Sequence, residues 1–317
     1  MKGFRWMFGW LAMMLVVSVA GCPKGRVGKR RQWGVSEQHD LGQTLVKVRQ
    51  GEHTEALSKQ ATEAVVKGDW ESLKAVAEKW LAQFGADPVE GLAKEAGAAY
   101  EAEERGDEEA ARRHEEAMGR WVEQIRKMPD EWLVPAFLRW QSCFMLGEVM
   151  EASPWHNALW RVVSENKKRI EVVVAWAKEV VKGHPDSAMA LVTLGLAYAW
   201  SERYDEAIAS FNHAIALDSE FANAYLGRGD AYLAKGNIDR AIADFNRAIQ
   251  IKPDDAEAYL KLALACQMAM KQQPKKREEY QRQAIEALNK FIELAPKQGW
   301  ARDIPTARRM LKVLQGK

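Results

Sequence analysis

Residues 188–221 read AMALVTLGLAYAWSERYDEAIASFNHAIALDSEF, and residues 222–255 read ANAYLGRGDAYLAKGNIDRAIADFNRAIQIKPDD. The two stretches are equally long, and 13 of their 34 positions are identical. A fixed period of this length is typical of a solenoid, in which each unit is a helical hairpin that buries its apolar face against its neighbours. No strand-like alternation interrupts the helical periodicity from about Thr54 onward. The chain is therefore predicted to be all-α.

The identical positions have a regular spacing. The first copy contains L-G-x-x-Y at 194–198, both copies contain A-x-x-x-F followed by a further Ala, and Pro253 closes the second copy. This pattern resembles the tetratricopeptide repeat family. The resemblance implies two antiparallel helices per unit, with Gly195 and Gly229 where the helices approach closely and Tyr and Phe in the remaining space. It also implies a solenoid that presents a binding surface rather than a catalytic site.

The resemblance extends beyond the two clear copies. Residues 256–298 read as a third unit that contains a polar, basic insertion around 272–280. Residues 301–314 form an amphipathic stretch suited to the capping helix that terminal repeats need. The repeats and their cap are therefore predicted to occupy residues 184–317.

The preceding region, residues 43–183, is predicted to be helical and rich in tryptophan. Gly68-Asp69 and Gly106-Asp107 each separate two helix-length apolar patterns, as the tight turn of a hairpin would. We therefore expect degenerate helical hairpins ahead of the tetratricopeptide-type solenoid.

Residues 1–21 have the pattern of a signal peptide. Lys2 and Arg5 precede an apolar run at 6–20, and small residues precede Cys22. The run is short for a membrane span. A cysteine in this position resembles the bacterial lipobox, which implies that Cys22 becomes the lipidated first residue of the mature chain, carrying a diacylglyceryl group and an amide-linked acyl chain such as palmitate. The alternatives are an ordinary cleaved signal or an uncleaved anchor.

Residues 22–42 are predicted to be a flexible, basic tether. Residues 23–31 carry five positive charges and no negative ones, and a basic stretch beside a lipid anchor is attracted to anionic headgroups by about 1 kcal/mol per residue. The alternative is a solvated linker without specific contacts. In lipoproteins of this kind an Asp after the lipidated cysteine tends to retain the protein at the inner membrane, so Pro23 favours the periplasmic face of the outer membrane.

A search for catalytic chemistry finds no recognisable motif. The six histidines are scattered, and His114, which opens a His-Glu-x-x-His pattern, has Met118 in place of the second ligand. No Gly-x-Ser-x-Gly elbow or paired-cysteine metal spacing occurs. Charge is nearly balanced, with 46 basic and 44 acidic residues. We expect no enzymatic activity, no metal, no cofactor beyond the covalent lipid on Cys22 and no nucleic-acid partner.

Residues 121–176 hold six tryptophans among helices that are apolar almost all round. These rings are expected either to fill a thick helical core or to form an aromatic face that binds a partner. Cys143 and Cys266 each lie within an apolar helical pattern. We expect buried free thiols, although a disulfide is conceivable in an oxidising compartment.

The resemblance places repeat positions 2, 5, 9, 12 and 13 of each first helix on a concave surface. This surface would suit an amphipathic helix or an extended apolar segment. The Lys and Asn residues with which some family members clamp a terminal carboxylate are absent. The alternative is that the N-terminal helices or the cap already cover this face. The predicted groove consists of Met189, Val192, Leu196, Trp200, Leu226, Asp230, Leu233, Leu260, Leu264 and Met268.

Together these patterns predict a membrane-anchored, periplasm-facing scaffold or adaptor lipoprotein. Its expected partners are a segment of another envelope protein, in an assembly or pilotin-like role, and the membrane itself through the lipid anchor and basic tether. A second hypothesis is a ligand-binding lipoprotein that serves a solute transporter through a pocket in the Trp-rich region.

Overall fold

The structure is a computed structural model, and its described part is helical, with turns and no strands. This confirms the predicted all-α class. The predicted signal peptide, Cys22 and the tether lie outside the described residues. The chain divides into two compact units, one with the described residues up to Glu179 and the other with those from Val180 onward. The described residues are 52–82, 105–127, 129–145, 167–298, 300, 303–316 and five helical positions between 91 and 102.

The first unit begins with a hairpin of α3 (Glu52–Lys67) and α4 (Trp70–Leu81), which pack against each other. Gly68 adopts a positive φ of 66°, a conformation that glycine reaches without a steric penalty. The Asp69 carboxylate caps α4 by accepting a hydrogen bond from the Ser72 amide at 3.0 Å. The turn signal in the sequence therefore forms a tight turn here.

The core of this unit is rich in large rings. Of the tryptophans in 121–176, Trp132, Trp140 and Trp176 are buried, and Trp176 Nε1 donates a hydrogen bond to Ser58 Oγ at 3.2 Å. These three rings favour the core alternative for the Trp-rich stretch. The elements are α6 (Glu108–Lys127), η2 (Asp130–Trp132), α7 (Leu133–Met145), η3 (Lys167–Ile170) and the part of α9 (Glu171–Gly183) up to Glu179, with α7 packed on α4.

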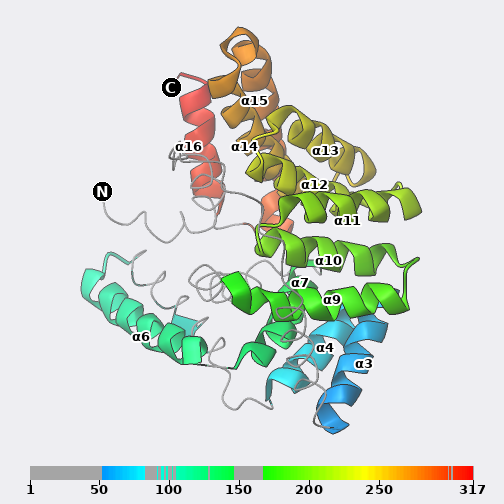
Figure 1. The fold of residues 1–317 in the computed structure, drawn as a ribbon. Coiled ribbons are helices and arrows are strands. Elements are labelled where there is room, and N and C mark those ends of the chain that lie inside the picture. Colours follow the sequence, from blue (N-terminus) through cyan, green and yellow to red (C-terminus); the bar gives the residue numbers. More distant parts are fainter. Residues whose placement is uncertain are drawn as a thin grey trace, which may run out of the picture. The chain divides into compact units, whose positions relative to one another are not determined.

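The second unit consists of three successive helical hairpins and a final helix (Figure 1). The helices within each hairpin pack together, and the second helix of one hairpin packs on the first helix of the next. The hairpins are α10 (Ala188–Trp200) with α11 (Tyr204–Leu217), α12 (Ala222–Ala234) with α13 (Ile238–Ile251), and α14 (Ala256–Gln272) with α15 (Arg277–Leu294). The final helix, α16 (Ile304–Leu314), packs on α15 as a cap would.

Three glycines in the first helices allow phenylalanine rings to pack directly on the backbone. A Cβ at Gly195 would lie 2.7 Å from Phe211 Cε1, and one at Gly229 would lie 2.5 Å from Phe245 Cε1. Both contacts occur within a hairpin, where the sequence predicts the closest approach. Gly227 adds a contact between hairpins, because a Cβ there would lie 2.5 Å from Phe211 Cζ. Phe211 is therefore held by two successive repeats.

The third hairpin accommodates the predicted insertion mainly by lengthening its helices. α14 has 17 residues where α10 and α12 have 13, and α15 has 18 where α11 and α13 have 14. The short helix η4 (Pro274–Lys276) joins them. Asp239 of α13 anchors this connection by accepting hydrogen bonds from Gln273 Nε2 and Tyr280 Oη, each at 2.9 Å. After α15 the chain continues through η5 (Ala295–Gln298).

Candidate functional site

The first helices of the three hairpins, α10, α12 and α14, carry all ten residues of the predicted groove. Six of these residues are buried: Val192, Trp200, Leu226, Leu233, Leu260 and Leu264. The other four, Met189, Leu196, Asp230 and Met268, are partly exposed. Because six of the ten are buried, the part of this face that a partner could contact is narrower than the sequence suggests. Their role in binding stays a prediction.

A charged cluster links α12 and α14 on this set of helices. Lys261 is 5% exposed, and its Nζ lies 2.6 Å from Asp230 Oδ2 and 3.0 Å from Glu257 Oε1. Glu257 is also buried, whereas the Asp230 side chain keeps 35% of its exposure. Buried charges of this kind persist in proteins when they are paired. One ammonium group here is shared by two carboxylates from adjacent repeats.

A third carboxylate, Asp255, lies at the start of α14. Its Oδ1 accepts hydrogen bonds from the Glu257 and Ala258 amides at 3.0 and 3.4 Å, so it caps the helix. Its Oδ2 lies 3.7 Å from Lys252 Nζ. Asp255 is thus occupied by the helix end and by its own lysine, and it adds negative potential to the neighbouring cluster.

The pKa values of the cluster reflect burial opposed by ion pairing. Burial raises the pKa of Glu257, Lys261 opposes this rise, and the nearby carboxylates of Asp255 and Asp230 add to it, so that the pKa is about 7. The pKa of Asp230 is likewise raised by burial, against the attraction of Lys261. Burial alone would lower the pKa of Lys261, but the two carboxylates outweigh it and raise that pKa, so the ammonium stays charged. Above pH 7, where Glu257 is ionised, the cluster therefore holds more carboxylate than one cation neutralises.

Sequence reasoning missed Lys261, although it placed Asp230 in the groove. In the 34-residue alignment the Lys261 position corresponds to Thr193 and Gly227 of the earlier copies, so repeat spacing gave no reason to expect a charge. A signal was present in the spacing of Glu257 and Lys261, because residues four apart are neighbours on a helix surface. A lysine inside an otherwise apolar helix needs a partner, and these two acids provide it.

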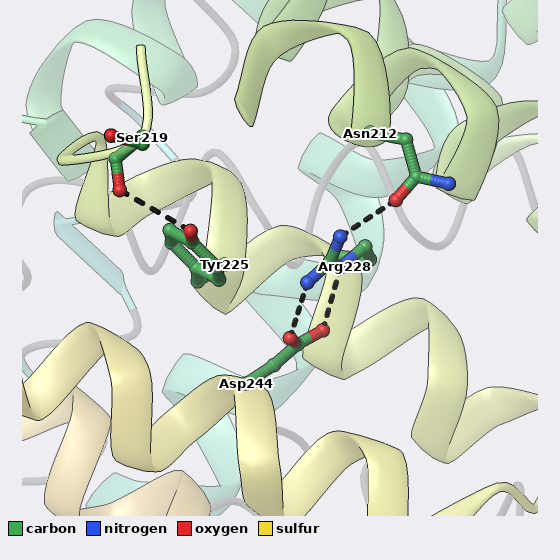
Figure 2. Close-up of polar contacts among 5 residues, drawn as sticks. All are labelled: Asn212, Ser219, Tyr225, Arg228 and Asp244. Atoms are coloured by element: carbon green, nitrogen blue, oxygen red, sulfur yellow. Dashed lines mark hydrogen bonds and ion pairs between the residues drawn. The ribbon is translucent and has the colours of Figure 1, made fainter. Parts of the chain in front are cut away.

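A second polar network joins the first two hairpins (Figure 2). Arg228 of α12 donates to both carboxylate oxygens of Asp244 on α13, at 2.6 and 2.9 Å, and to Asn212 Oδ1 on α11 at 2.7 Å. The Asp244 hydrogen bond is the main cause of a raised Arg228 pKa. Figure 2 also shows Tyr225 beside this arginine, with its hydroxyl donating to the Ser219 carbonyl at 3.2 Å. This largely buried, bidentate pair, together with the hydrogen bond to Asn212, links three helices and acts structurally.

The other cysteine and histidine side chains that the structure describes show no sign of chemical activation. Cys266 is a buried free thiol, as predicted, and burial raises its pKa to about 12, which disfavours the nucleophilic thiolate. The side chain of Cys143 lies outside the described residues. His114 Nδ1 lies 2.7 Å from Glu95 Oε2. Within the described residues, no group of His, Cys, Asp and Glu side chains could hold a metal ion.

Helix length and apolar character also bear on membrane crossing. Among the helices that the structure describes, none combines the length and the apolar character that a bilayer span requires.

Comparison with known proteins supports the repeat assignment. The TPR repeat profile matches residues 195–236 and 229–268, so this part of the chain consists of tetratricopeptide repeats. Repeats of this class mediate protein–protein interactions. No curated protein matches the chain.

Several solved structures are similar to the chain at low identity. They include TTC0263, a TPR protein of Thermus thermophilus, at 19% identity over 67% of this chain and 95% of that one, with a TM-score of 0.38. A MamA fragment from Desulfovibrio magneticus RS-1 is 19% identical over 67% of this chain and 98% of its own, with a TM-score of 0.34. The TPR2AB domain of yeast Sti1 is 16% identical over 82% of this chain and 98% of its own, with a TM-score of 0.36.

Proposed function

We propose that this protein is a scaffold or adaptor lipoprotein that docks a segment of another envelope protein on the first helices of its tetratricopeptide repeats. The observation that supports this most directly is the partly exposed row formed by Leu196 on α10, Asp230 on α12 and Met268 on α14. Two of these three partly exposed side chains are apolar, and side chains of this kind on neighbouring helices suit the apolar face of an incoming segment.

The proposed location at the membrane rests on the N-terminal sequence pattern. Cys22 follows small residues at the end of an apolar run, and the basic stretch that follows it would face anionic headgroups. Two or more acyl chains hold a protein at a membrane stably, whereas one chain gives marginal binding. We place the protein on the periplasmic face of a bacterial outer membrane, tethered through the lipid on Cys22.

Docking is tested by crosslinking in living cells, followed by identification of the captured protein. The variant carries Leu196→Glu and Met268→Glu, which place charge in the proposed contact surface. Val313→Glu on α16 is the matched control, because it also places a charge at an apolar position and Val313 is 76% exposed. We expect the double variant to keep a melting temperature close to that of the control and to lose its crosslinked partner. Unchanged capture by a folded double variant would move the docking site elsewhere.

Anchoring is tested separately by mass spectrometry of the mature N-terminus and by membrane fractionation. The expected mature chain begins with an acylated Cys22, and Cys22→Ala should release the protein from the membrane while leaving its repeats folded. An unmodified Cys22, or a mature chain that begins at another residue, would contradict the lipoprotein assignment without affecting the docking proposal.

A further inference from the structure

The charged cluster of Asp230, Glu257 and Lys261 leaves acceptor capacity unused. Glu257 is 7% exposed, and its Oε1, although 3.0 Å from Lys261 Nζ, receives no hydrogen bond of good geometry. Asp230 Oδ1 is a buried oxygen that receives no hydrogen bond either. Desolvated carboxylate oxygens without donors are costly, and native proteins rarely keep them without a reason. The cluster therefore has the capacity to accept one more hydrogen bond.

The charge of the cluster decides what kind of donor fits. Two carboxylates share the single ammonium of Lys261, and Asp255 contributes further negative potential from the helix start. This arrangement repels an anion and attracts a cation. A metal ion is disfavoured because an ammonium group already lies between the carboxylates. An organic cation with N–H donors meets both the charge and the hydrogen-bonding requirement.

The cluster also lies where a docked segment would pass. Asp230 occupies the same repeat position as Leu196 in the preceding copy and Leu264 in the following one, so a charged residue is flanked by apolar residues on the adjacent first helices. The Asp230 side chain is 35% exposed, so a partner can approach the cluster from this side, although Oδ1 itself is buried. Met268, two turns after Lys261 on α14, extends the accessible apolar surface.

We propose that Asp230 and Glu257 receive one Lys or Arg side chain of the docked segment, with Lys261 as the internal counter-ion that holds both carboxylates in place. This inference rests on the proposed docking function and adds the chemistry of the partner: a basic residue flanked by apolar ones. Charge complementarity of this kind fixes the position of a bound segment more than it adds affinity.

The test uses a random dodecapeptide library displayed on phage and selected against the full mature chain, residues 22–317. We expect the enriched peptides to share a Lys or Arg at one position with apolar residues on both sides. The consensus peptide is then synthesised with the basic residue intact and with Gln in its place. The Gln peptide should bind the wild-type protein at least tenfold more weakly.

Two protein variants test whether the charged cluster causes the preference for the basic peptide. Asp230→Asn keeps an oxygen for Lys261 and removes the charge, and Glu257→Gln does the same on α14. Each should weaken the basic peptide about tenfold and leave the Gln peptide nearly unchanged. Glu286→Gln, an exposed site on α15, makes the same change in net charge and should affect neither peptide.

The possible outcomes separate the two proposals. Enriched peptides without a shared basic position, or variants that weaken both peptides equally, would overturn the inference and leave docking intact. The inference would also be overturned if the enriched peptides share a basic residue but both variants still prefer the basic peptide to the Gln peptide. Another site would then recognise the basic residue. Failure to select any peptide would count against the docking function as well as against this inference.

Discussion

The A-x-x-x-F position of the second helix holds Phe211 in the first hairpin and Leu288 in the third, and both side chains are fully buried. Phe211 packs against the backbone of Gly195 in its own hairpin and of Gly227 in the next one. The third hairpin has Ala263 where the earlier copies have Gly195 and Gly229, and Phe291 packs edge-on against Trp300, with ring centroids 6.2 Å apart. Glycines thus accommodate the buried ring early in the array, whereas the third hairpin has its buried ring about one turn later on the helix, against an aromatic neighbour.

The difference shows how a repeat changes when it no longer has a similar neighbour on both sides. Gly–Phe packing brings two helices close together and repeats identically along the array. The third hairpin instead uses longer helices, a methyl group at the former glycine position and the charged cluster around Lys261. The first two hairpins share the Gly–Phe packing, and the third hairpin adds Lys261 and Glu257, of which Lys261 pairs with Asp230 of the second hairpin.

The largest effect is expected from removing the ring that joins two repeats. Phe211→Ala deletes a fully buried side chain between the first and second hairpins. Substitutions of this kind cost about 3–5 kcal/mol, and denaturant unfolding measures the loss. Leu217→Ala is the control on the same helix, because Leu217 is 42% exposed and its loss should cost below about 1 kcal/mol. Equal losses would show that Phe211 does not join the repeats.

The next effect is a dependence of the free energy of unfolding on pH, which arises from Glu257 in the third hairpin. Burial raises the pKa of Glu257 to about 7, above its unfolded value of 4.5, so its contribution to stability is complete below pH 4.5 and is lost as the pH rises through 7. The pKa difference corresponds to roughly 3 kcal/mol at most, since one pKa unit equals about 1.36 kcal/mol. Glu257→Gln should remove this decline, as measured by unfolding between pH 4.5 and 8. Parallel stability curves for the two proteins would show that Glu257 titrates normally.

A third prediction compares the glycine position of the second hairpin, Gly229, with the alanine at the same repeat position in the third hairpin, Ala263. Gly229→Ala should destabilise by about 1–3 kcal/mol, because its Cβ would overlap the Phe245 ring. Ala263→Gly should also destabilise, by about 1 kcal/mol, since it lowers helix propensity and relieves no crowding.

The control is Gly119→Ala on α6, where a new Cβ meets nothing within 4 Å. That change should stabilise the protein by up to about 1 kcal/mol through helix propensity. Thermal melts of the three variants give the signs directly. Stabilisation by Ala263→Gly would mean that the third hairpin is as tightly packed as the second.

The sequence predicted the repeating architecture well because a few residue types carry it. The glycines, the alanines and the buried phenylalanines each have one physical role, and the 34-residue period repeats that role. Exposure could not be predicted equally well. Trp200 and Leu260 lie on the expected helices but are buried, because burial depends on contacts from distant parts of the chain. Lys261 was missed because its partner Asp230 lies 31 residues away on another helix.

The smallest effect is expected at the turns inside the first two hairpins. Glu202 has a φ of 58° between α10 and α11, and its counterpart one repeat later is Gly236, with a φ of 77°. The left-handed conformation costs a non-glycine residue about 1–2 kcal/mol, while glycine loses about 0.5–1 kcal/mol more through its freedom in the unfolded chain. Glu202→Gly should therefore stabilise the protein by roughly 0.5–1 kcal/mol, seen as a rise of a few degrees in Tm.

The reciprocal change provides the control for this last prediction. Gly236→Ala introduces a side chain into the same conformation, where nothing lies within 4 Å of the new Cβ, so any loss comes from backbone strain alone. We expect a loss of about 1 kcal/mol from that strain. If Glu202→Gly lowers the Tm instead, contacts of the Glu202 side chain outweigh its backbone strain, and the two turns are equivalent in backbone shape but not in energy.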